Sequence, residues 1–438
     1  MLRIDDLRLD SDILPFFDYT DNPRAKQCLL GLLKIPLATT ALLEERQQII
    51  QGFINNWAVL GDFGYRTLDY QEVRQYFSSL SFEALPTGAA ALRRVVRLHF
   101  SEAARRQLHS SQVQTVLFLE KLQRLYLRPL NKSVFPNDFT EQLRWALDFL
   151  RKLDLDSLLV KIRDDEFSTT QSLRFANLLN GLGEEACAKF WQFLALFEAY
   201  WSIARGMLKH GFTFPKVGGE DFRLEQFYHP AVAEVVKNSL LLLPHERVVV
   251  LTGPNMSGKS TLLKAIGLCV YLAHVGIGVP AARCEIPFFQ TLVVVINSAD
   301  NLQAGYSHFM TEIKTLKAVV EQARASRPCF ALFDELFRGT NVDDALDITQ
   351  TTLRGLTQFP HCFFFVSTHL LQLEKQQAIA SDNIKKYHVE CELVQESPVF
   401  SYVLREGWSA LKIGRIIFDK EGLGHLLRPA EGNEIQPR

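Results

Sequence analysis

The feature that most constrains this chain is the octapeptide Gly253–Ser260, which fits the pattern G-x-x-x-x-G-K-[ST] at every fixed position. An apolar run, Arg247–Leu251, precedes it, and a helix-like segment, Lys259–His274, follows it. Glycines let backbone N–H groups turn inward around phosphate oxygens, and a helix N-terminus adds partial positive charge. The context therefore predicts a strand, a phosphate-binding loop and a helix, which are the parts of a parallel α/β fold.

The residue types in this loop predict how a nucleotide is held. Lys259 is expected to reach the β- and γ-phosphates, and the Ser260 hydroxyl is expected to bind Mg²⁺. The backbone around them supplies the remaining contacts. The predicted nucleotide-binding positions are Gly253, Pro254, Asn255, Met256, Ser257, Gly258, Lys259, Ser260 and Thr261.

A second segment, Cys329–Glu335, is an apolar strand pattern that ends in two carboxylates. In a chain with a complete phosphate-binding loop, this is a Walker-B pattern. Asp334 is expected to hold Mg²⁺, directly or through water, and Glu335 to polarise the attacking water as a general base. A third apolar run, Phe363–Val366, is followed by Ser367-Thr368-His369, where His369 is the best candidate for sensing the γ-phosphate; a structural histidine is the alternative.

The pattern of apolar residues divides the chain near residue 215. Before it, stripes at helical spacing run through Leu42–Trp57, Val113–Tyr126 and Trp191–Leu208. After it, short β-branched runs alternate with amphipathic segments, which predicts a mostly parallel sheet covered on both faces. The strands are expected at 247–251, 292–296, 329–333 and 363–366, and the helices at 259–274, 307–325 and 343–358. We therefore expect a helical domain over 1–214 and an α/β nucleotide-binding domain over 215–438.

Composition restricts the cellular compartment, the metal sites and the nucleic-acid surfaces that we expect. The seven cysteines include no Cys-x-x-Cys, which argues against a disulfide framework and a zinc site. Met1–Asp6 lacks the apolar core of a signal peptide, and the longest apolar run, Ile266–Pro280, is too short to span a bilayer, so we expect a cytoplasmic protein with no membrane contact. A net charge of −1 means that any nucleic-acid surface is local. The arginine-rich stretch 93–128 is one candidate, although an ordinary solvated helix face is the plainer interpretation.

Beyond the general pattern, the motifs resemble those of the MutS mismatch-repair ATPases. The segment Thr252–Thr261 includes the Pro-Asn-Met of that family, and Arg338-Gly339-Thr340 resembles its Walker-B extension. Further segments are also similar: Ser367-Thr368-His369, Ala304–Met310, His229-Pro230-Ala231-Val232 and, in the first half, Leu42–Ile49. The resemblance covers most of the chain and is most specific over roughly residues 225–375.

The resemblance implies a fold and a set of roles. We expect an α/β P-loop (ABC-type) ATPase domain preceded by an all-α MutS core or lever domain, with ATP and Mg²⁺ as cofactors. Asn255 would contact the γ-phosphate or its water, and His369 would be the switch residue. Ser307 would approach the nucleotide of a partner subunit, because family members are dimers with composite ATP sites. The same resemblance implies a dimer that acts on DNA, with other repair proteins as candidate partners; we expect a homodimer, and a heterodimer is the alternative.

The sequence also departs from the family pattern. Mismatch-recognising members carry an N-terminal reader domain, whereas this chain begins at core-like sequence, so we expect a short form without that domain. Phe337 occupies a position where a small residue is usual, and His308 one where a hydroxyl residue is usual. No adenine-stacking aromatic is evident at Asn238-Ser239-Leu240, so the sequence assigns no residue to the base.

Two functions from different classes fit these observations. The first is an ATP-hydrolysing switch that binds mismatched, branched or damaged DNA. The second is an ATP-gated module that recruits proteins without recognising DNA mismatches directly. A transporter ATPase is disfavoured, because its Leu-Ser-Gly-Gly-Gln signature is absent, and so is a GTPase, because no Asn-Lys-x-Asp segment occurs.

Overall fold

The computed structural model describes residues 1–80, 102–296, 308–375, 381–394, 397–409, 416, 418 and 420–427. The chain divides into two compact units. The sheet unit comprises Met1–Ile13, Pro36–Leu43 and Phe212–Arg438, and the helical unit comprises Leu14–Ile35 and Glu44–Gly211.

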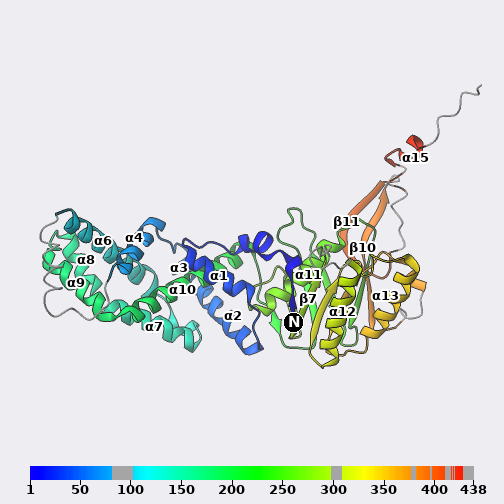
Figure 1. Cartoon of the computed structure of the whole chain (residues 1–438), viewed down its shortest axis with the longest axis horizontal. Coiled ribbons are helices and arrows are strands. Elements are labelled where there is room, and N and C mark those ends of the chain that lie inside the picture. The colour runs from blue at the N-terminus through cyan, green and yellow to red at the C-terminus, as the bar shows by residue number, and fades with distance from the viewer. Residues whose placement is uncertain are drawn as a thin grey trace, which may run out of the picture. The chain divides into compact units, whose positions relative to one another are not determined.

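The sheet unit is built on seven strands in the order β1-β7-β8-β9-β5-β10-β11. Figure 1 labels three of them, β7, β10 and β11. All neighbours are parallel except β10 and β11, which form an antiparallel hairpin. The strands are β1 (Leu2–Arg3), β5 (Val248–Thr252), β7 (Thr291–Val295), β8 (Cys329–Phe333), β9 (Phe363–Ser367), β10 (Ile384–Val394) and β11 (Ser397–Glu406). The four strands predicted from sequence are confirmed, with ends displaced by no more than one residue.

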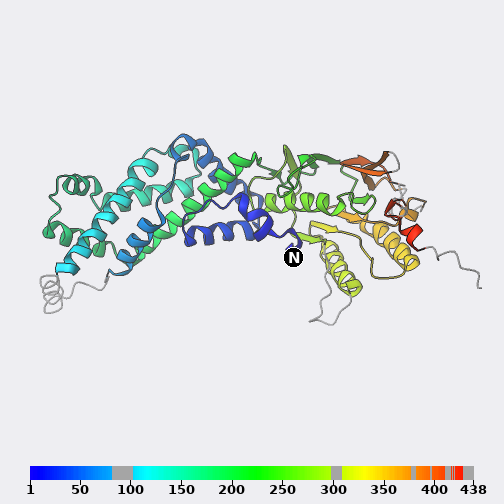
Figure 2. The ribbon, with the colours of Figure 1, turned by 90° about the horizontal axis from the view of Figure 1, so that it is seen from above.

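Helices cover both faces of this sheet, as its continuous apolar strands require. Helices α12 (His308–Arg324) and α13 (Val342–Leu356) pack on the face that carries Val250, Ala331 and Phe364. Helix α11 (Lys259–His274) contacts β7 and the second, smaller sheet. Figure 2 shows α11 on one side of the large sheet and α12 and α13 on the other. The three predicted helices are therefore confirmed.

A second sheet of four strands has the order β2-β6-β3-β4. Its strands are β2 (Lys216–Val217), β3 (Phe222–Phe227), β4 (Asn238–Leu242) and β6 (Arg283–Ile286). Phe222 of β3 is fully buried, and its ring lies parallel to that of Phe330 with the centroids 6.2 Å apart. This contact joins the small sheet to the β8 side chains that point away from α12.

The N-terminal residues belong to the sheet unit, which differs from the boundary expected at 214/215. Strand β1 pairs in parallel with β7, and the Ile296 N–H donates to the Asp6 carboxylate at 2.8 Å. The Leu37 N–H donates to the His274 carbonyl at 2.8 Å. A two-residue strand has no detectable apolar period, so hydrophobic patterning could not assign the first residues to the sheet.

The helical unit contains the part of α2 (Thr40–Asn55) from Glu44 onward and a set of further helices. These are α1 (Pro23–Lys34), α3 (Trp57–Leu60), α4 (Thr67–Ser78), α6 (Glu102–Lys121), α7 (Asn137–Arg151), α8 (Leu155–Arg163), α9 (Thr169–Leu182) and α10 (Glu184–His210). Helix α6 continues into a π-helical turn, Leu122–Leu127. The three stripes at helical spacing fall on helices: 42–57 on α2 and α3, 113–126 on α6 and its π-helical turn, and 191–208 on α10.

Helix α10 is the centre of the helical unit, because most of its residues are buried. Aromatic side chains from elsewhere in the unit pack against it: the ring centroid of Phe63, between α3 and α4, lies 5.1 Å from that of Trp201, and Phe149 of α7 stacks on Phe190 at 4.8 Å. Ring pairs at these separations add to the free energy of burial. The helix ends where Gly211 adopts a φ of 67°, a left-handed conformation that favours glycine.

One charged side chain lies inside this aromatic core. Glu198 of α10 has no exposed surface, and its carboxylate accepts hydrogen bonds from the Asp21 N–H at 2.6 Å, the Asn22 amide at 2.8 Å and the Tyr65 hydroxyl. Burial raises the pKa of Glu198 to about 7. Asn22 also caps α1 by accepting from the Ala25 N–H at 2.9 Å, so this network fixes the start of α1 on α10.

Candidate nucleotide site

The candidate site lies at the carboxyl ends of three adjacent strands. In the sheet, β9 lies between β8 and β5. The Gly253–Ser260 loop follows β5, Asp334 and Glu335 follow β8, and Ser367 ends β9. Ligands of open α/β sheets bind at this edge, where loops from neighbouring strands meet. The fold therefore brings together the segments that the sequence analysis selected separately.

The Gly253–Ser260 loop needs glycine at two positions. Gly253 has a φ of 147° and Gly258 a φ of 90°, both in the region that side-chain-bearing residues rarely adopt. A Cβ on Gly253 would lie 3.0 Å from the Ser257 hydroxyl, and one on Gly258 would lie 3.0 Å from the Tyr402 ring. The loop then enters α11 at Lys259. The first backbone N–H groups of that helix have no helical acceptor and are available to an anion.

Lys259 is buried beneath this loop. Its ammonium donates to the carbonyls of Gly253 at 2.9 Å and Pro254 at 3.0 Å. Burial lowers the pKa of Lys259, while Glu335 and Asp334 act in the opposite direction. The structure thus holds a cation directly under the loop, with carboxylates near it.

Asp334 is held by a hydroxyl group on each of its oxygens. The Ser260 hydroxyl donates to Oδ2 at 2.5 Å, and the Ser367 hydroxyl donates to Oδ1. The Asp334 backbone is fixed as well, because its N–H donates to the Val295 carbonyl at 2.8 Å. Ser260 and Asp334, predicted as one metal-binding pair from distant segments, are therefore direct neighbours.

This pair suits Mg²⁺ in a nucleotide complex. Mg²⁺ prefers oxygen ligands and usually combines one or two protein groups with water and substrate phosphates. Ser260 is exposed at the mouth of the site and supplies one such oxygen, and Asp334 supplies another. Across the described residues, no group of three or more His, Cys, Asp and Glu side chains could hold a metal alone. The donor set therefore fits a metal that arrives with its nucleotide.

Glu335 has an uncommon backbone conformation, with φ of 51°. Its N–H donates to the Ser367 hydroxyl at 2.9 Å, and its carboxylate pairs with Arg338 at 2.9 Å. Left-handed backbone at a non-glycine residue persists where the surroundings enforce it, and it recurs at functional sites. The Ser367 contact supplies part of that enforcement.

Phe337 shows how the chain accommodates a large residue where small ones are usual. It has a φ of 67° and no exposed surface, and its ring lies 6.2 Å from that of Phe309 on α12. Its N–H donates to the buried Glu312 carboxylate at 3.0 Å. Packing and this hydrogen bond together hold a conformation that a phenylalanine rarely adopts. They also connect the segment after Asp334 to α12.

The remaining predicted site residues are two exposed catalytic candidates and one nucleotide-binding candidate outside the described residues. Asn255 and His369 are both exposed, and the structure gives neither a hydrogen bond among the residues it describes. Ser307 lies outside the described residues, and α12 begins immediately after it at His308. The structure therefore brings together Lys259, Ser260, Asp334 and Glu335, while Asn255 and His369 stand free to approach a ligand.

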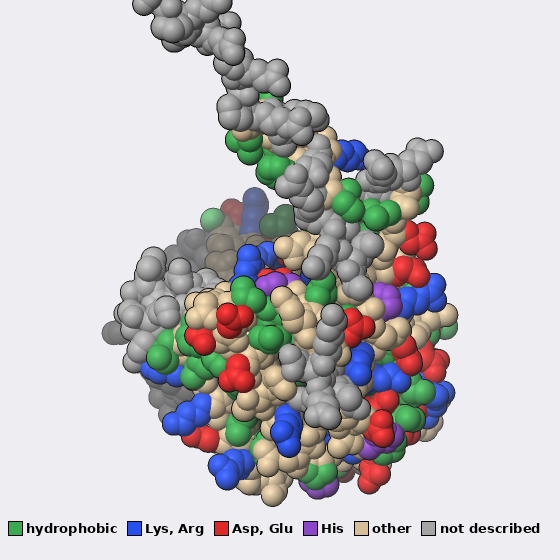
Figure 3. Space-filling view, turned by 90° about the vertical axis from the view of Figure 1, so that its right-hand side faces the viewer, with side chains coloured by type: hydrophobic (Ala, Val, Ile, Leu, Met, Phe, Trp, Pro, Cys, Tyr) green, Lys and Arg blue, Asp and Glu red, His purple; other side chains and the backbone are tan. Residues whose placement is uncertain are grey.

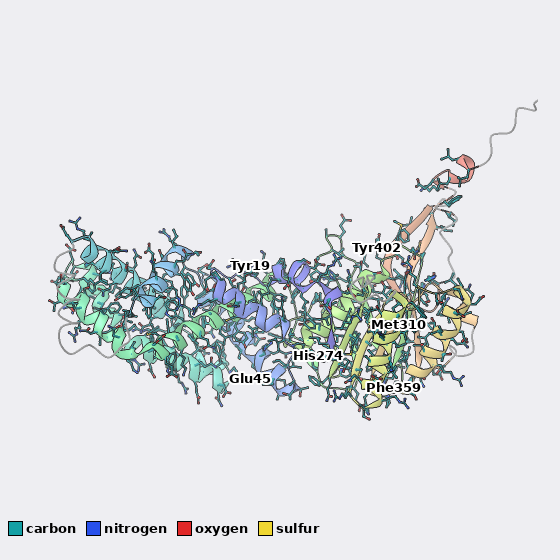
Figure 4. The ribbon with its side chains drawn as sticks, viewed as in Figure 1. Tyr19, Glu45, His274, Met310, Phe359 and Tyr402 are labelled. Atoms are coloured by element: carbon teal, nitrogen blue, oxygen red, sulfur yellow. The ribbon has the colours of Figure 1, made fainter. Side chains whose placement is uncertain are left out.

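A cavity of about 480 Å³ opens beside the Gly253–Ser260 loop. It is lined by Gly258 of the loop, by Thr261 of α11 and by more distant residues, among them Tyr228, Val389 and Tyr402. Figure 4 shows Tyr402 on β11 of the hairpin. Apolar and aromatic walls next to the predicted phosphate-binding loop suit a planar base. Sequence reasoning missed Tyr402, because it looked for an aromatic near residues 238–240.

Asn238, which lies in that sequence segment, has a different part in the cavity. Its amide donates to the Tyr402 carbonyl at 3.0 Å, and its side-chain oxygen accepts from the Leu404 N–H at 2.7 Å. Both bonds attach β4 to β11 on either side of residue 403. Asn238 is therefore not itself an aromatic contact for a base, but it holds the backbone that carries Tyr402.

The arginine-rich stretch 93–128, which includes α6, offers less free charge than its sequence suggests. Arg106 pairs with Glu102, Arg124 with Glu120 at 2.5 Å, and Arg128 with Asp156 at 2.7 Å. Arg93, Arg94 and Arg97 lie outside the described residues.

The surface of the sheet unit has charges of both signs at the end seen in Figure 3. Basic and acidic side chains are interspersed there among the residues shown in colour.

No helix within the described ranges combines the length and apolar character needed to cross a membrane.

Comparison with known proteins adds an independent finding. Residues 249–423 match the family model described as MutS domain V. A DNA mismatch repair protein MutS of Thermus thermophilus is 31% identical over 268 residues, which are 60% of this chain and 31% of that protein. A protein of the same name from Aquifex pyrophilus is 30% identical over 211 residues, 47% of this chain and 24% of the relative. The matched part thus spans about a third or less of these relatives.

Proposed function

Because this chain belongs to the MutS family, we propose that it binds and hydrolyses ATP and acts as an ATP-driven switch on mismatched, branched or damaged DNA in repair. The observation that carries the proposal is the meeting of Lys259, Ser260, Asp334 and Glu335 at one edge of the sheet. The matched relatives are named as DNA mismatch repair proteins, and that name supports the DNA part of the proposal.

The phosphates of ATP would lie in the Gly253–Ser260 loop. The loop N–H groups and the start of α11 would bind their oxygens, and Asn255 would contact the γ-phosphate or its water. Lys259 would exchange the carbonyls of Gly253 and Pro254 for phosphate oxygens. Met256, Ser257 and Thr261 complete the predicted lining of the phosphate and base sites.

Ser260 and Asp334 would hold Mg²⁺ together with the phosphates. When bound, Mg²⁺ neutralises the charge that develops on the transferred phosphoryl group. Glu335 would take the proton from the attacking water as general base. For this, its carboxylate has to exchange its ion pair with Arg338 for the water.

The base of the nucleotide would occupy the cavity beside Gly258, where the Tyr402 ring is available for stacking. His369 would respond to the γ-phosphate as the switch residue. Ser307 would reach the nucleotide of a second subunit, so that ATP binding stabilises a homodimer with composite sites. The helical unit would correspond to the core or lever domain and carry contacts to DNA or to other repair proteins.

The decisive experiment measures ATP hydrolysis by the purified chain, alone and with homoduplex, mismatched and four-way-junction oligonucleotides. We expect hydrolysis in the wild type, a rate changed by at least one of these DNAs, and a loss of about 10²–10⁴-fold in Glu335→Gln. Nucleotide binding should persist in that variant, because Gln retains the shape of the side chain. Hydrolysis that survives Glu335→Gln unchanged would exclude Glu335 as the base.

The alternative function, an ATP-gated module that recruits proteins, has one observation in its favour. Three arginines of the candidate DNA-contacting stretch, Arg106, Arg124 and Arg128, are already paired with carboxylates. Hydrolysis that depends on Glu335 but is indifferent to every DNA, together with no retention of DNA at low salt, would favour this alternative.

A further inference from the structure

We propose that Ser367 is a positioning residue for the Mg²⁺ site: it fixes the orientation of the Asp334 carboxylate and the backbone of Glu335 at the same time. This inference rests on the proposed nucleotide site, and it concerns a residue to which sequence reasoning gave no role. Its hydroxyl is the one group that contacts both acidic residues among the hydrogen bonds of the described chain.

The position of Ser367 follows from strand register. β9 pairs with β5 so that Ser367 lies opposite Leu251, and with β8 so that Val366 lies opposite Phe333. Ser367 is therefore level with Asp334, the residue after Phe333. It has no exposed surface, so its hydroxyl must find partners within the protein. A serine at this register can reach the residues that end β8.

The polarity of its two hydrogen bonds fixes the direction of the hydroxyl proton. The Glu335 N–H donates to the Ser367 oxygen at 2.9 Å, so that oxygen acts there as an acceptor. A serine hydroxyl has a single proton to donate, and it is directed to Asp334 Oδ1. Asp334 Oδ1 is thereby occupied, and Oδ2 is turned to the side of Ser260.

The hydrogen bonds from the two serines to Asp334 should respond differently when a metal binds. Ser260 is exposed and is itself a predicted Mg²⁺ ligand, so its bond to Asp334 must yield to the ion. Ser367 is buried on the other oxygen and has no such competitor. It can hold the carboxylate through the exchange, which is the part that outer partners of metal ligands commonly have.

The same hydroxyl supports Glu335. That residue has a φ of 51°, and its N–H bond to Ser367 helps to hold this uncommon conformation. Removing the hydroxyl would release the Asp334 side chain and the Glu335 backbone together. A serine that served only to end β9 would affect stability, but it would leave the affinity for Mg²⁺ unchanged.

The test uses ADP as the nucleotide and Mg²⁺ as the titrant. The full chain is saturated with ADP in metal-free buffer, Mg²⁺ is added, and the midpoint is followed by isothermal titration calorimetry. Ser367→Ala should raise the Mg²⁺ midpoint by about tenfold to a hundredfold, while ADP affinity in EDTA matches that of the wild type. Ser367→Thr, which keeps the hydroxyl, should stay close to the wild type.

Two further variants keep the test decisive. Thr and Val side chains have the same shape and differ only in that Thr has a hydroxyl where Val has a methyl group. If Ser367→Ala does not fold, the Mg²⁺ midpoints of Ser367→Thr and Ser367→Val can be compared, because the two variants pack alike. Thr349→Val is the matched control, because it removes a buried hydroxyl in α13 that has no partner in the described structure. It should leave the Mg²⁺ midpoint unchanged.

The outcomes separate this inference from the proposed function. A wild-type chain that binds no ADP would overturn the nucleotide site and the role of Ser367 with it. A wild-type chain that binds ADP and Mg²⁺, with Ser367→Ala or Ser367→Val showing the same Mg²⁺ midpoint, would overturn the role of Ser367 alone. A loss of ADP affinity in EDTA equal to the loss with Mg²⁺ would reassign Ser367 to a purely structural position.

Discussion

The two units each bring carboxylates together with hydrogen-bond donors, but they do so in opposite ways. In the helical unit, Glu198 is fully buried and its three donors come from within the same unit. In the sheet unit, Asp334 and Glu335 lie at a solvent-accessible edge, and some of their partners, Ser260 and Arg338, are exposed. The first arrangement is closed. The second can exchange its internal partners for a ligand.

The comparison shows why a buried charge is by itself a poor guide to function. A satisfied buried network stabilises and specifies one packing arrangement, whereas an unpaired buried group is costly. Functional sites instead keep groups that can change partners and backbone that is held under strain. Glu335 and Phe337 have left-handed backbone beside the site, whereas the residues that contact Glu198 do not. The next three predictions test this difference.

The largest expected effect follows from opening the closed network. Glu198→Ala leaves the Tyr65 hydroxyl, the Asn22 amide and the Asp21 N–H without their acceptor, and it leaves a cavity. We expect the free energy of unfolding to fall by about 3–5 kcal/mol, measured by urea denaturation. Glu198→Gln, which retains an acceptor oxygen, should lose less. Unchanged stability in Glu198→Ala would contradict the structural role of Glu198. Lost nucleotide affinity in a folded variant would contradict the assignment of ligand binding to the sheet unit alone.

The same residue predicts a dependence of stability on pH. Burial raises the pKa of Glu198 from its ordinary 4.5 to about 7, so the folded protein binds a proton that the unfolded chain has released. The stabilising contribution is complete below pH 4.5 and is lost as the pH rises through 7. For a fully buried group it amounts to about 3 kcal/mol. Glu198→Gln should flatten this part of the profile, and identical profiles for variant and wild type would assign the slope to other groups.

The smallest expected effect lies in the open site. Tyr402→Ala removes the ring beside Gly258 and should weaken ADP binding by about 1–3 kcal/mol, measured by isothermal titration calorimetry. Tyr402→Phe keeps the ring and serves as the control. Because Tyr402 is about half exposed, the thermal midpoint should change little in either variant. ADP affinity in Tyr402→Ala equal to that of the wild type would place the base outside this cavity.

Local patterns were sufficient for a large part of the sheet unit. The Gly253–Ser260 loop, the strand before Asp334 and the helix after Lys259 are continuous segments, so spacing and residue type could predict them. Parallel strand order then brings their ends together. What spacing could not give is the orientation of a side chain, such as the Ser367 hydroxyl that joins Asp334 to Glu335.

The missed residues depend on long-range contacts. Tyr402 reaches the loop because Asn238, 164 positions earlier, holds its carbonyl. The first residues of the chain join the sheet through a strand of two residues. Phe337 occupies a left-handed position that its residue type disfavours, and only the surrounding core and Glu312 make this possible. Such features are set by tertiary packing, so local sequence patterns do not predict them.

The contacts of Lys259 have a consequence for the binding and release of phosphate groups. The ammonium donates to the carbonyls of Gly253 and Pro254, so the loop contains its own competitor for any anion that approaches Lys259. Any incoming phosphate has to displace these two carbonyls, and any departing product is replaced by them. Under the proposed function, the affinity for ATP would be a difference between two sets of bonds to one ammonium. Under the proposed function, such a loop would favour release of the product over its retention, because the two carbonyls would pair with the Lys259 ammonium as the product leaves.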